Sequence, residues 1–322
     1  MTRFLQSAAA AAILLLGFAA PQTVVAETEQ WVLVTGASTG IGRNLAETLA
    51  DSGYHVYAGA RSDEDLASLD AIDNITAVRL DVTKQDQVDA VVDLITERGT
   101  GLYGLVNNAG VGGGGKVLET PVAGQTFVYQ VNVEGVYRTT KAFAPLVAEQ
   151  NGRIVTTGSI AGTMSWAGGN AYSGSKHWIE AFTDALAAEM EPLGVHVSVV
   201  EPGNFQSHIR RSAVARAFAQ VEAAGGEITE EMRQFQKGTV ERELAYKEPD
   251  AVSEAFMHAL FDDEPLRRYV VTPNEEEHVA TIRTKLTELV QLNQWGRYSH
   301  SRDELVDMLD EILSGGTAET VE

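Results

Sequence analysis

The sequence predicts an α/β fold in which one doubly wound sheet of seven parallel strands carries helices on both faces. After residue 30, short runs of β-branched residues alternate with amphipathic stretches, which is the pattern of a parallel sheet with helical crossovers. The first run, Trp31–Val34, leads through a glycine-rich turn into a helical segment from about Ile41 to Ser52. With 322 residues, 44% of them hydrophobic, the chain can bury one large core of this kind.

The remaining strands are expected where β-branched runs are bounded by turn residues. They are Tyr54–Ala58, Thr76–Leu80, Gly104–Asn107, Arg153–Thr157, Val195–Val200 and Tyr269–Thr272. Helices are predicted between them, near residues 84–98, 121–149 and 172–191. No internal repeat or linker composition divides the chain, so residues 27–315 are predicted to form a single domain.

Two segments depart from the alternating pattern. Residues 205–247 are charged and helical where the strands pause, which fits either a mobile cover over a substrate site or an ordinary surface insertion. The tail, 316–322, is expected to be disordered.

The N-terminus, residues 1–26, has the composition of an export signal. Arg3 precedes an apolar run from Ala8 to Ala20, and small residues lead to Ala26. The run is shorter than the roughly 20 residues that cross a bilayer, which favours cleavage after Ala26 over a permanent membrane anchor. Export would place the protein in a periplasm or at a membrane, whereas an unprocessed leader would leave it in the cytoplasm.

Composition excludes several classes of function. A formal charge of −21 repels phosphate backbones, so nucleic acid is not an expected partner. The absence of cysteine excludes disulfides, thiolate catalysis and cysteine-ligated zinc. The seven histidines show no metal-ligand spacing, and no metal is expected.

The turn after the first strand reads Thr35-Gly36-Ala37-Ser38-Thr39-Gly40-Ile41-Gly42. Glycines there let backbone N–H groups approach a pyrophosphate, and the following helix N-terminus adds partial positive charge. The turn therefore predicts a dinucleotide site of the Rossmann type, formed by Gly36, Ser38, Thr39, Gly40, Ile41 and Gly42; a tight turn without a ligand is the alternative. Its spacing resembles the short-chain dehydrogenase/reductase family in its compact, single-domain form.

Other motifs of that family recur further along the chain. Asn107-Asn108-Ala109-Gly110 matches the family's NNAG after the fourth strand, which implies that Asn108, Ala109 and Gly110 lie near the adenosine side of the cofactor. The resemblance also implies adenine contacts at Asp81 and Val82, and nicotinamide contacts at Pro202, Gly203 and Ser207.

Tyr172 and Lys176 are the residues from which chemistry is predicted. Four positions apart, they project from one face of a helix, and an ammonium close to a phenol lowers a pKa that is ordinarily near 10. Ser159 follows the fifth strand, at the sheet edge where ligands of open α/β folds bind. Asn132, Ser159, Tyr172 and Lys176 occur in the family's order and with its separations.

That resemblance implies a catalytic role for each of the four. Tyr172 exchanges a proton with the substrate oxygen, and Ser159 positions that oxygen. Lys176 binds the nicotinamide ribose and lowers the pKa of the tyrosine, while Asn132 holds a water. Tyr172 and Lys176 therefore also count as cofactor-binding residues.

The end of the second strand indicates which cofactor is used. Ala60 stands where a carboxylate would bind a free adenosine ribose, and Arg61 can pair with a 2′-phosphate, so NADP(H) is favoured and NAD(H) is left open. The segments around Val106 and Val200 resemble the hydroxysteroid and retinol dehydrogenase branch, which implies a small or hydrophobic alcohol or ketone as substrate.

Three questions stay open at this level. The basic cluster His208, Arg210 and Arg211 is interpreted as a solvated helix face, with contact to a substrate carboxylate or cofactor phosphate as the alternative. A catalytically silent NAD(P)-binding sensor is the alternative to an enzyme. Relatives commonly form homodimers or homotetramers through the helices near 121–149 and 172–191, and the resemblance implies the same here.

Overall fold

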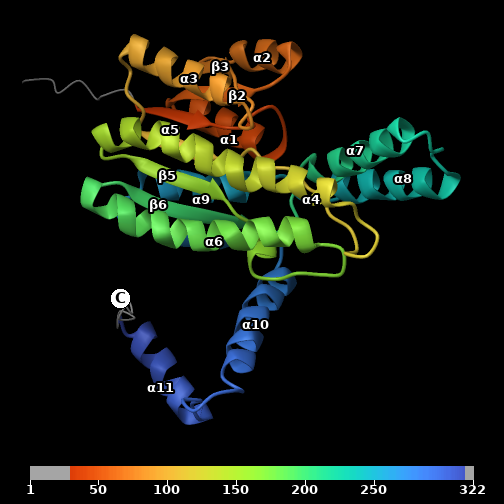
Figure 1. The fold of residues 1–322 in the computed structure, drawn as a ribbon. Coiled ribbons are helices and arrows are strands. Elements are labelled where there is room, and N and C mark those ends of the chain that lie inside the picture. Colours follow the sequence, from red (N-terminus) through yellow and green to blue (C-terminus); the bar gives the residue numbers. More distant parts are fainter. Residues whose placement is uncertain (1–29, 316–322) are drawn as a thin grey trace, which may run out of the picture.

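The computed structural model describes residues 30–315. It contains the predicted sheet of seven parallel strands, in the order β3-β2-β1-β4-β5-β6-β7 (Figure 1). The strands are β1 Trp31–Val34, β2 His55–Ala60, β3 Ile75–Arg79, β4 Gly104–Asn107, β5 Arg153–Thr157, β6 His196–Pro202 and β7 Arg268–Val271. The predictions for residues 1–26 and 316–322 lie outside the described residues.

The helices follow the strands as crossovers and then extend beyond the sheet. In chain order they are α1 Gly40–Asp51, α2 Asp63–Asp70, α3 Gln85–Arg98, α4 Val122–Tyr129, α5 Val136–Glu149, α6 Asn170–Met190, α7 Ile209–Ala223, α8 Glu230–Leu244, α9 Asp250–Phe261, α10 Glu275–Leu292 and α11 Arg302–Leu313. Short 3-10 turns occupy Ile160–Gly162 and Glu191–Leu193.

Two hydrophobic cores lie on the two faces of the sheet. On one face α1 and α9 pack through side chains such as Leu45 and Phe256. On the other, α3, α5 and α6 pack through side chains such as Val91, Phe143 and Leu186. Burial on both faces explains why the strands read as continuous apolar runs in the sequence.

The helix expected over residues 121–149 is present over 122–149, but its middle is π-helical rather than α-helical. A π-helical turn over Gln130–Gly135 separates α4 from α5 and contains Asn132. Gly135 passes so close to the end of β3 that a Cβ there would lie 2.6 Å from the Val82 side chain. A local widening of this kind redirects side chains, and π turns often occur at functional sites.

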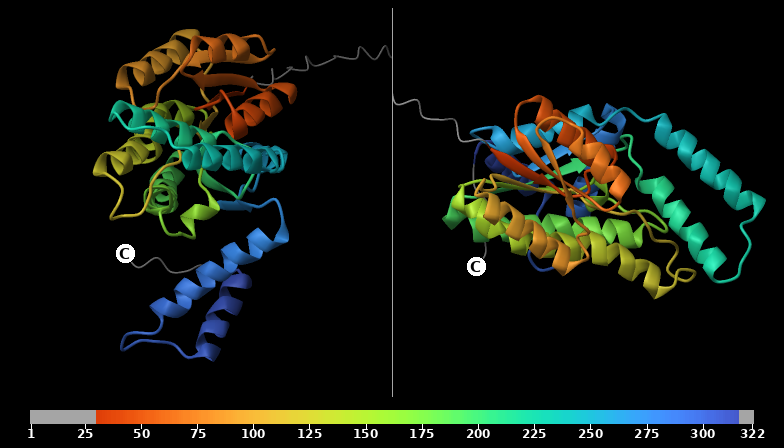
Figure 2. Two further views of the ribbon diagram at one scale, coloured as in Figure 1. Left: turned by 90° about the vertical axis from the view of Figure 1, so that its right-hand side faces the viewer. Right: turned by 90° about the horizontal axis from the view of Figure 1, so that it is seen from above.

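Helices α7 and α8 contact each other and project beyond the carboxyl end of the sheet (Figures 1 and 2). They form the helical part of residues 205–247, which we call the cover segment. Helices α10 and α11, which the sequence did not indicate, extend away from the sheet (Figure 1). None of the helices described in residues 30–315 combines the length and hydropathy needed to span a membrane.

Candidate active site

The glycine-rich turn after β1 is joined directly to the end of β4. The Thr35 hydroxyl accepts the backbone N–H groups of Asn108 and Ala109, both at 3.0 Å. Gly36 has a φ of +66°, and a Cβ there would lie 2.8 Å from the Ala109 backbone. Only glycine fits this conformation and this approach, so two motifs far apart in the sequence form one wall.

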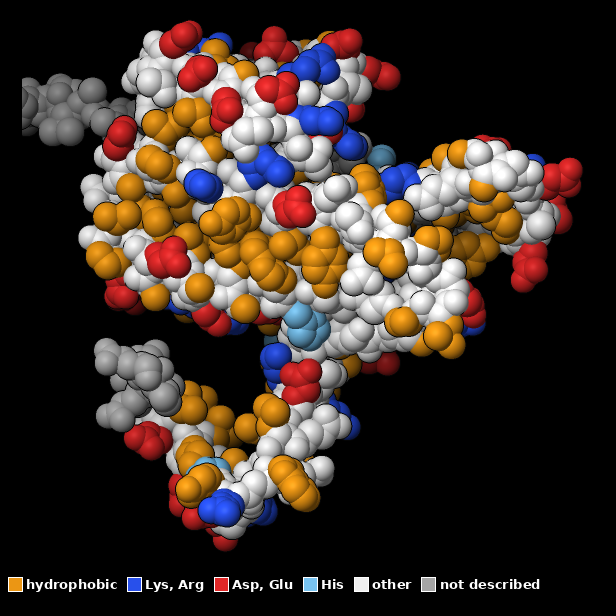
Figure 3. All heavy atoms as spheres, viewed as in Figure 1, with side chains coloured by type: hydrophobic (Ala, Val, Ile, Leu, Met, Phe, Trp, Pro, Cys, Tyr) orange, Lys and Arg blue, Asp and Glu red, His pale blue; other side chains and the backbone are white. Residues whose placement is uncertain are grey.

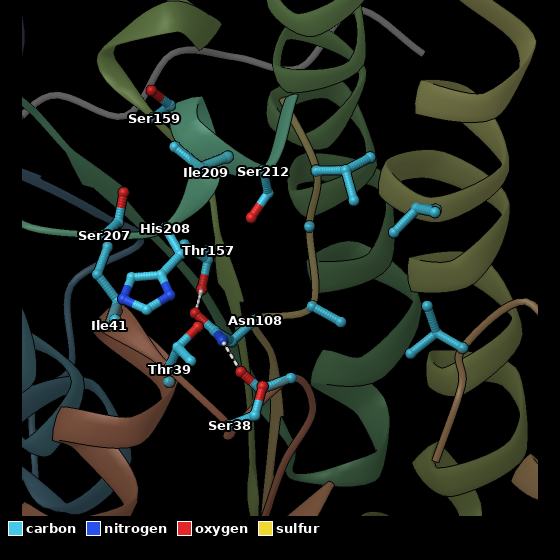
Figure 4. Close-up of a pocket in the computed structure, with 18 of the residues that line it drawn as sticks. Ser38, Thr39, Ile41, Asn108, Thr157, Ser159, Ser207, His208, Ile209 and Ser212 are labelled. Carbon is cyan, nitrogen blue, oxygen red and sulfur yellow. Dashed lines mark hydrogen bonds between the residues drawn. The ribbon is translucent and has the colours of Figure 1, made fainter. Parts of the chain in front are cut away.

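The cover segment packs onto the same turn. Gly40 has a φ of +59°, and a Cβ there would lie 3.2 Å from the Ser207 Cα. Figure 4 shows Ser207 and His208 beside Thr39 and Ile41, with the Thr157 hydroxyl bonded to Asn108 at 3.2 Å. The turn is therefore bounded by β4 on one side and by the start of the cover segment on the other.

One cavity of about 240 Å³ collects every residue predicted to bind a cofactor, and we call it the dinucleotide cavity. Its lining includes Gly36, Ser38, Thr39, Gly40, Ile41, Gly42, Arg61, Asp81, Val82, Asn108, Ala109, Gly110, Tyr172, Lys176, Pro202, Gly203 and Ser207. Ser159 lines it as well, so three of the four predicted catalytic residues meet there.

Lys176 is a buried residue of this lining, with 5% of its surface exposed. Its Nζ donates to the Thr157 carbonyl at 2.6 Å and lies 5.7 Å from the centre of the Tyr172 ring. Burial lowers the pKa of Lys176 to about 8, against the opposing effect of the Glu180 carboxylate. The amine is thus held at the end of β5 and is still largely charged at neutral pH.

The pKa of Tyr172 moves in the direction opposite to the sequence expectation. Burial raises it, while a side-chain hydrogen bond with Ser159 and the charge of Arg210 lower it by less. The ammonium of Lys176 is turned to the Thr157 carbonyl, which explains why it does not dominate the phenol. The phenol therefore stays protonated at neutral pH in this geometry.

Asn132 does not join the other three in the lining of the cavity. Its Oδ1 accepts the Val111 N–H at 2.8 Å, and its Nδ2 donates to the Val111 carbonyl and the Ser175 hydroxyl, both at 3.0 Å. The side chain connects the π turn to the loop after β4 and to α6, next to Lys176. The predicted water-holding role stays a prediction.

The sequence model of the short chain dehydrogenase family matches residues 30–217. The chain belongs to this family. It is 34% identical over 262 residues to the mitochondrial D-beta-hydroxybutyrate dehydrogenase of Bos taurus, covering 74% of this chain and 75% of the relative. It is 37% identical over 186 residues to retinol dehydrogenase 16 of Rattus norvegicus, covering 56% and 58%. A solved short chain dehydrogenase/reductase from Burkholderia phymatum, in complex with NAD, matches with a TM-score of 0.70 and 26% identity over 84% of this chain and 96% of that one.

As a short chain dehydrogenase, the protein is an oxidoreductase that acts on CH–OH or C=O groups with a nicotinamide dinucleotide. The residues present fit such a cofactor. The glycine turn, Tyr172 and Lys176 all line the dinucleotide cavity. Arg61 stands on the same lining at the end of β2.

Two carboxylates near this site, those of Glu201 and Glu180, were not identified in the sequence analysis. Glu201, the residue before Pro202, is 2% exposed, and burial together with the charge of Glu180 raises its pKa to about 7. Glu180 pairs with Arg268 through Oε2 at 3.0 Å, whereas its Oε1 is buried without a hydrogen-bond partner. The hydrophobic strand pattern around Glu201 marks it as buried, but nothing in the sequence places Glu180 beside it.

The cover segment contributes cofactor-side residues that were also missed, above all Arg216. Its guanidinium donates to the Gly112 carbonyl at 2.7 Å and lies 5.3 Å from the centre of the Phe127 ring. Burial and the positive charge of Arg61 lower the pKa of Arg216. Two arginines from distant parts of the chain therefore border one cavity.

In the basic cluster at the start of α7, His208 and Arg210 are exposed, as the sequence interpretation of a solvated face has it, but each also lines a cavity. His208 lines the dinucleotide cavity, and Arg211 pairs with the buried Glu243 at 3.1 Å. Arg210 lines a second cavity of about 630 Å³, which we call the substrate cavity. Ser159 and Tyr172 line both cavities, so the two meet at the predicted proton donor.

Proposed function

We propose that this protein transfers hydride between NADP(H) and a small or hydrophobic alcohol or ketone, with Tyr172 as general acid and base. The observation that carries the proposal is the position of Tyr172 and Ser159 on the boundary of the dinucleotide and substrate cavities. A group at this boundary can exchange a proton with a substrate while facing the reactive end of a dinucleotide.

The residues divide the chemistry as follows. The Ser159 hydroxyl orients the substrate oxygen, and the Tyr172 hydroxyl donates a proton to it during ketone reduction. Because burial raises the pKa of Tyr172, the phenol starts protonated, which suits donation. The Lys176 ammonium, fixed by Thr157, binds the cofactor ribose, and the bound nicotinamide supplies or accepts the hydride.

The preference for NADP(H) rests on charge. Arg61 and Arg216 line the dinucleotide cavity, and Ala60 provides no carboxylate to repel a 2′-phosphate. Arginine pairs with phosphate through two parallel hydrogen bonds, so this end of the cavity favours the phosphorylated cofactor.

The relatives' names point to different substrates. The bovine relative is named for D-beta-hydroxybutyrate and the rat relative for retinol, an acid and an apolar alcohol. Both carry the CH–OH group that the proposal requires, and the substrate cavity has room for either size.

The experiment is a steady-state assay of the purified protein with NADPH or NADH and a panel of ketones and alcohols, followed at the absorbance of the reduced cofactor. We expect turnover with a carbonyl substrate and a higher kcat/KM for NADPH. Saturable cofactor binding with no turnover across the panel would instead support the silent sensor.

Location and assembly complete the proposal. We propose export with cleavage after Ala26, which N-terminal sequencing of the mature protein would test. We also propose a homodimer or homotetramer, because hydrophobic side chains gather over α5 and α6 (Figure 3). Tyr137 there is 54% exposed. Light scattering of the purified protein measures the mass of the assembly.

A further inference from the structure

Arg210 stands on the wall of the substrate cavity, near the catalytic tyrosine. It is the second residue of α7 and lines the cavity together with Tyr172 and Ser159. Its charge reaches the phenol, because it lowers the pKa of Tyr172. A cation at this place acts on whatever binds beside the proton donor.

Arg210 is exposed to solvent, and its hydrogen bonds do not neutralise its charge. Its guanidinium donates to the Tyr246 hydroxyl at 2.6 Å and to the Asn204 side-chain oxygen, and it lies 5.4 Å from the centre of the Tyr246 ring. These partners are neutral. Within residues 30–315, Arg210 forms no ion pair with a carboxylate, although the chain as a whole carries a net charge of −21.

The nearby acids are already engaged elsewhere. Glu243 pairs with Arg211 at 3.1 Å and accepts the backbone N–H groups of Arg210 and Arg211 at 2.8 and 3.3 Å. Glu277 of α10 accepts the side-chain amide of Asn204 at 2.9 Å. Neutral groups thus fix the Arg210 guanidinium in place, while neighbouring carboxylates are occupied by other donors.

The rest of the substrate cavity is largely apolar. Met164, Trp166, Val214 and Phe235 line it, and its volume of about 630 Å³ exceeds what a very small alcohol fills. An apolar wall beside a cation that neutral groups hold is the arrangement that orients an amphipathic anion, and Arg242 is the other arginine of this lining.

We propose that the substrate is an alcohol or ketone that carries a carboxylate, which pairs with Arg210 while its hydrocarbon body packs against Trp166 and Phe235. This inference rests on the proposed function, because it names the substrate class of the same site. The substrate expected is a hydroxy or oxo acid rather than one of the uncharged alcohols that the cavity could also accommodate.

Binding tests this without turnover. Isothermal titration of the full chain, saturated with NADP⁺, with octanoate and with octanamide compares two probes of equal length, of which only the first is charged. We expect octanoate to bind at least about ten-fold more tightly. Arg210→Gln should bring the two affinities together by weakening octanoate alone, and Arg210→Lys, which keeps the charge, should retain part of the preference.

Two further variants control the result. Arg233→Gln removes an exposed cover-segment arginine outside the cavity lining and should keep the wild-type preference. Arg242→Gln removes the other arginine of that lining, whose Nε donates to the Gly238 carbonyl, and should also keep most of it. Equal affinity of the wild type for both probes, including no binding of either, overturns the proposal. A preference that survives Arg210→Gln or disappears with Arg242→Gln overturns it too.

The outcomes separate this inference from the proposed function. An octanoate preference that depends on Arg210, in a protein that turns over no ketone or alcohol, would retain the acid site and reject the enzyme assignment. Turnover of a ketone with no preference for an oxo acid over its methyl ester would retain the enzyme assignment and reject the acid site.

Discussion

The dinucleotide cavity and the substrate cavity share Tyr172 but are lined by different structural elements. The first is walled by the ends of buried strands and by a glycine turn whose backbone is fixed to β4. The second is walled largely by side chains of the cover segment and the loop before α6, several of them exposed, such as Trp166 and Phe235.

The difference shows how each kind of recognition is encoded. Backbone groups at fixed strand ends recognise the part of a ligand that stays constant, since a turn conformation needs particular residues at particular spacings. Side chains on projecting helices recognise the variable part, because they can change without disturbing the sheet.

The largest effect is expected from a substitution at the boundary of the two cavities. Tyr172→Phe removes the proton donor and keeps the ring, so kcat should fall about 1000-fold while the Kd for NADPH changes less than about two-fold. Stopped-flow assays and NADPH fluorescence titration measure the two quantities. Activity within ten-fold of the wild type would reject the assignment of Tyr172.

The second prediction tests whether a buried carboxylate at the end of β6 lowers the stability of the fold at high pH, whereas an exposed carboxylate of the cover segment does not. The folded-state pKa of Glu201, about 7, lies above its ordinary value of 4.5, so folding takes up a proton between these values. Stability is therefore lost as the pH rises from about 4.5 through 7. Glu201→Gln should remove this loss and exceed the wild type by on the order of 3 kcal/mol at pH 8, with little difference near pH 4.5.

Urea unfolding at the two pH values measures this change. Glu241→Gln is the matched control, because Glu241 is an exposed carboxylate of α8 with 64% of its side chain accessible. It should show no pH-dependent gain. An advantage of Glu201→Gln that is equal at both pH values would contradict the titration of Glu201.

A third substitution addresses the selectivity of the dinucleotide cavity. Arg61→Ala should weaken NADPH about 30-fold and NADH less than about two-fold, because only the former carries a phosphate at this end. Fluorescence titration of both cofactors gives the ratio, and Arg302→Ala, on the exposed α11, is the control. Equal losses for the two cofactors would place Arg61 away from the 2′-phosphate.

The smallest effect is expected at Gly174, because glycine is unfavourable inside a helix such as α6. A Cβ there would lie 2.6 Å from the Tyr129 hydroxyl of α4, so the glycine permits the packing of α6 against α4. Gly174→Ala should cost about 1 kcal/mol, although alanine favours helices by a similar amount. In a Tyr129→Phe background the same change should become neutral or stabilising, as urea unfolding would show. A loss of equal size in both backgrounds would mean that Tyr129 is not the obstacle.

The sequence predicts the dinucleotide cavity because its determinants are local. Seven strands follow from apolar runs, and Gly36 and Gly40 are recognisable from their spacing, since a tight turn leaves no other residue type. The catalytic residues Tyr172 and Lys176 lie on one helix, so their proximity follows from the helical repeat.

The rest depends on contacts between distant segments. The π turn around Asn132 contains Gly135, whose backbone lies against Val82, and no helical pattern in the sequence reveals this contact. Arg210 and Arg216 occur in a charged helix that periodicity alone describes as solvated, and only the fold directs them to two different cavities. The raised pKa of Glu201 likewise needs a burial that only the assembled sheet provides.

Four residues of one stretch, Gly203, Phe205, Ser207 and Ile209, border both cavities at once. A dinucleotide bound against this stretch would form part of the surface that the second reactant contacts. We therefore expect ordered kinetics, in which the coenzyme binds first and leaves last. Such an order would spare the protein from trapping its substrate with no redox partner at hand.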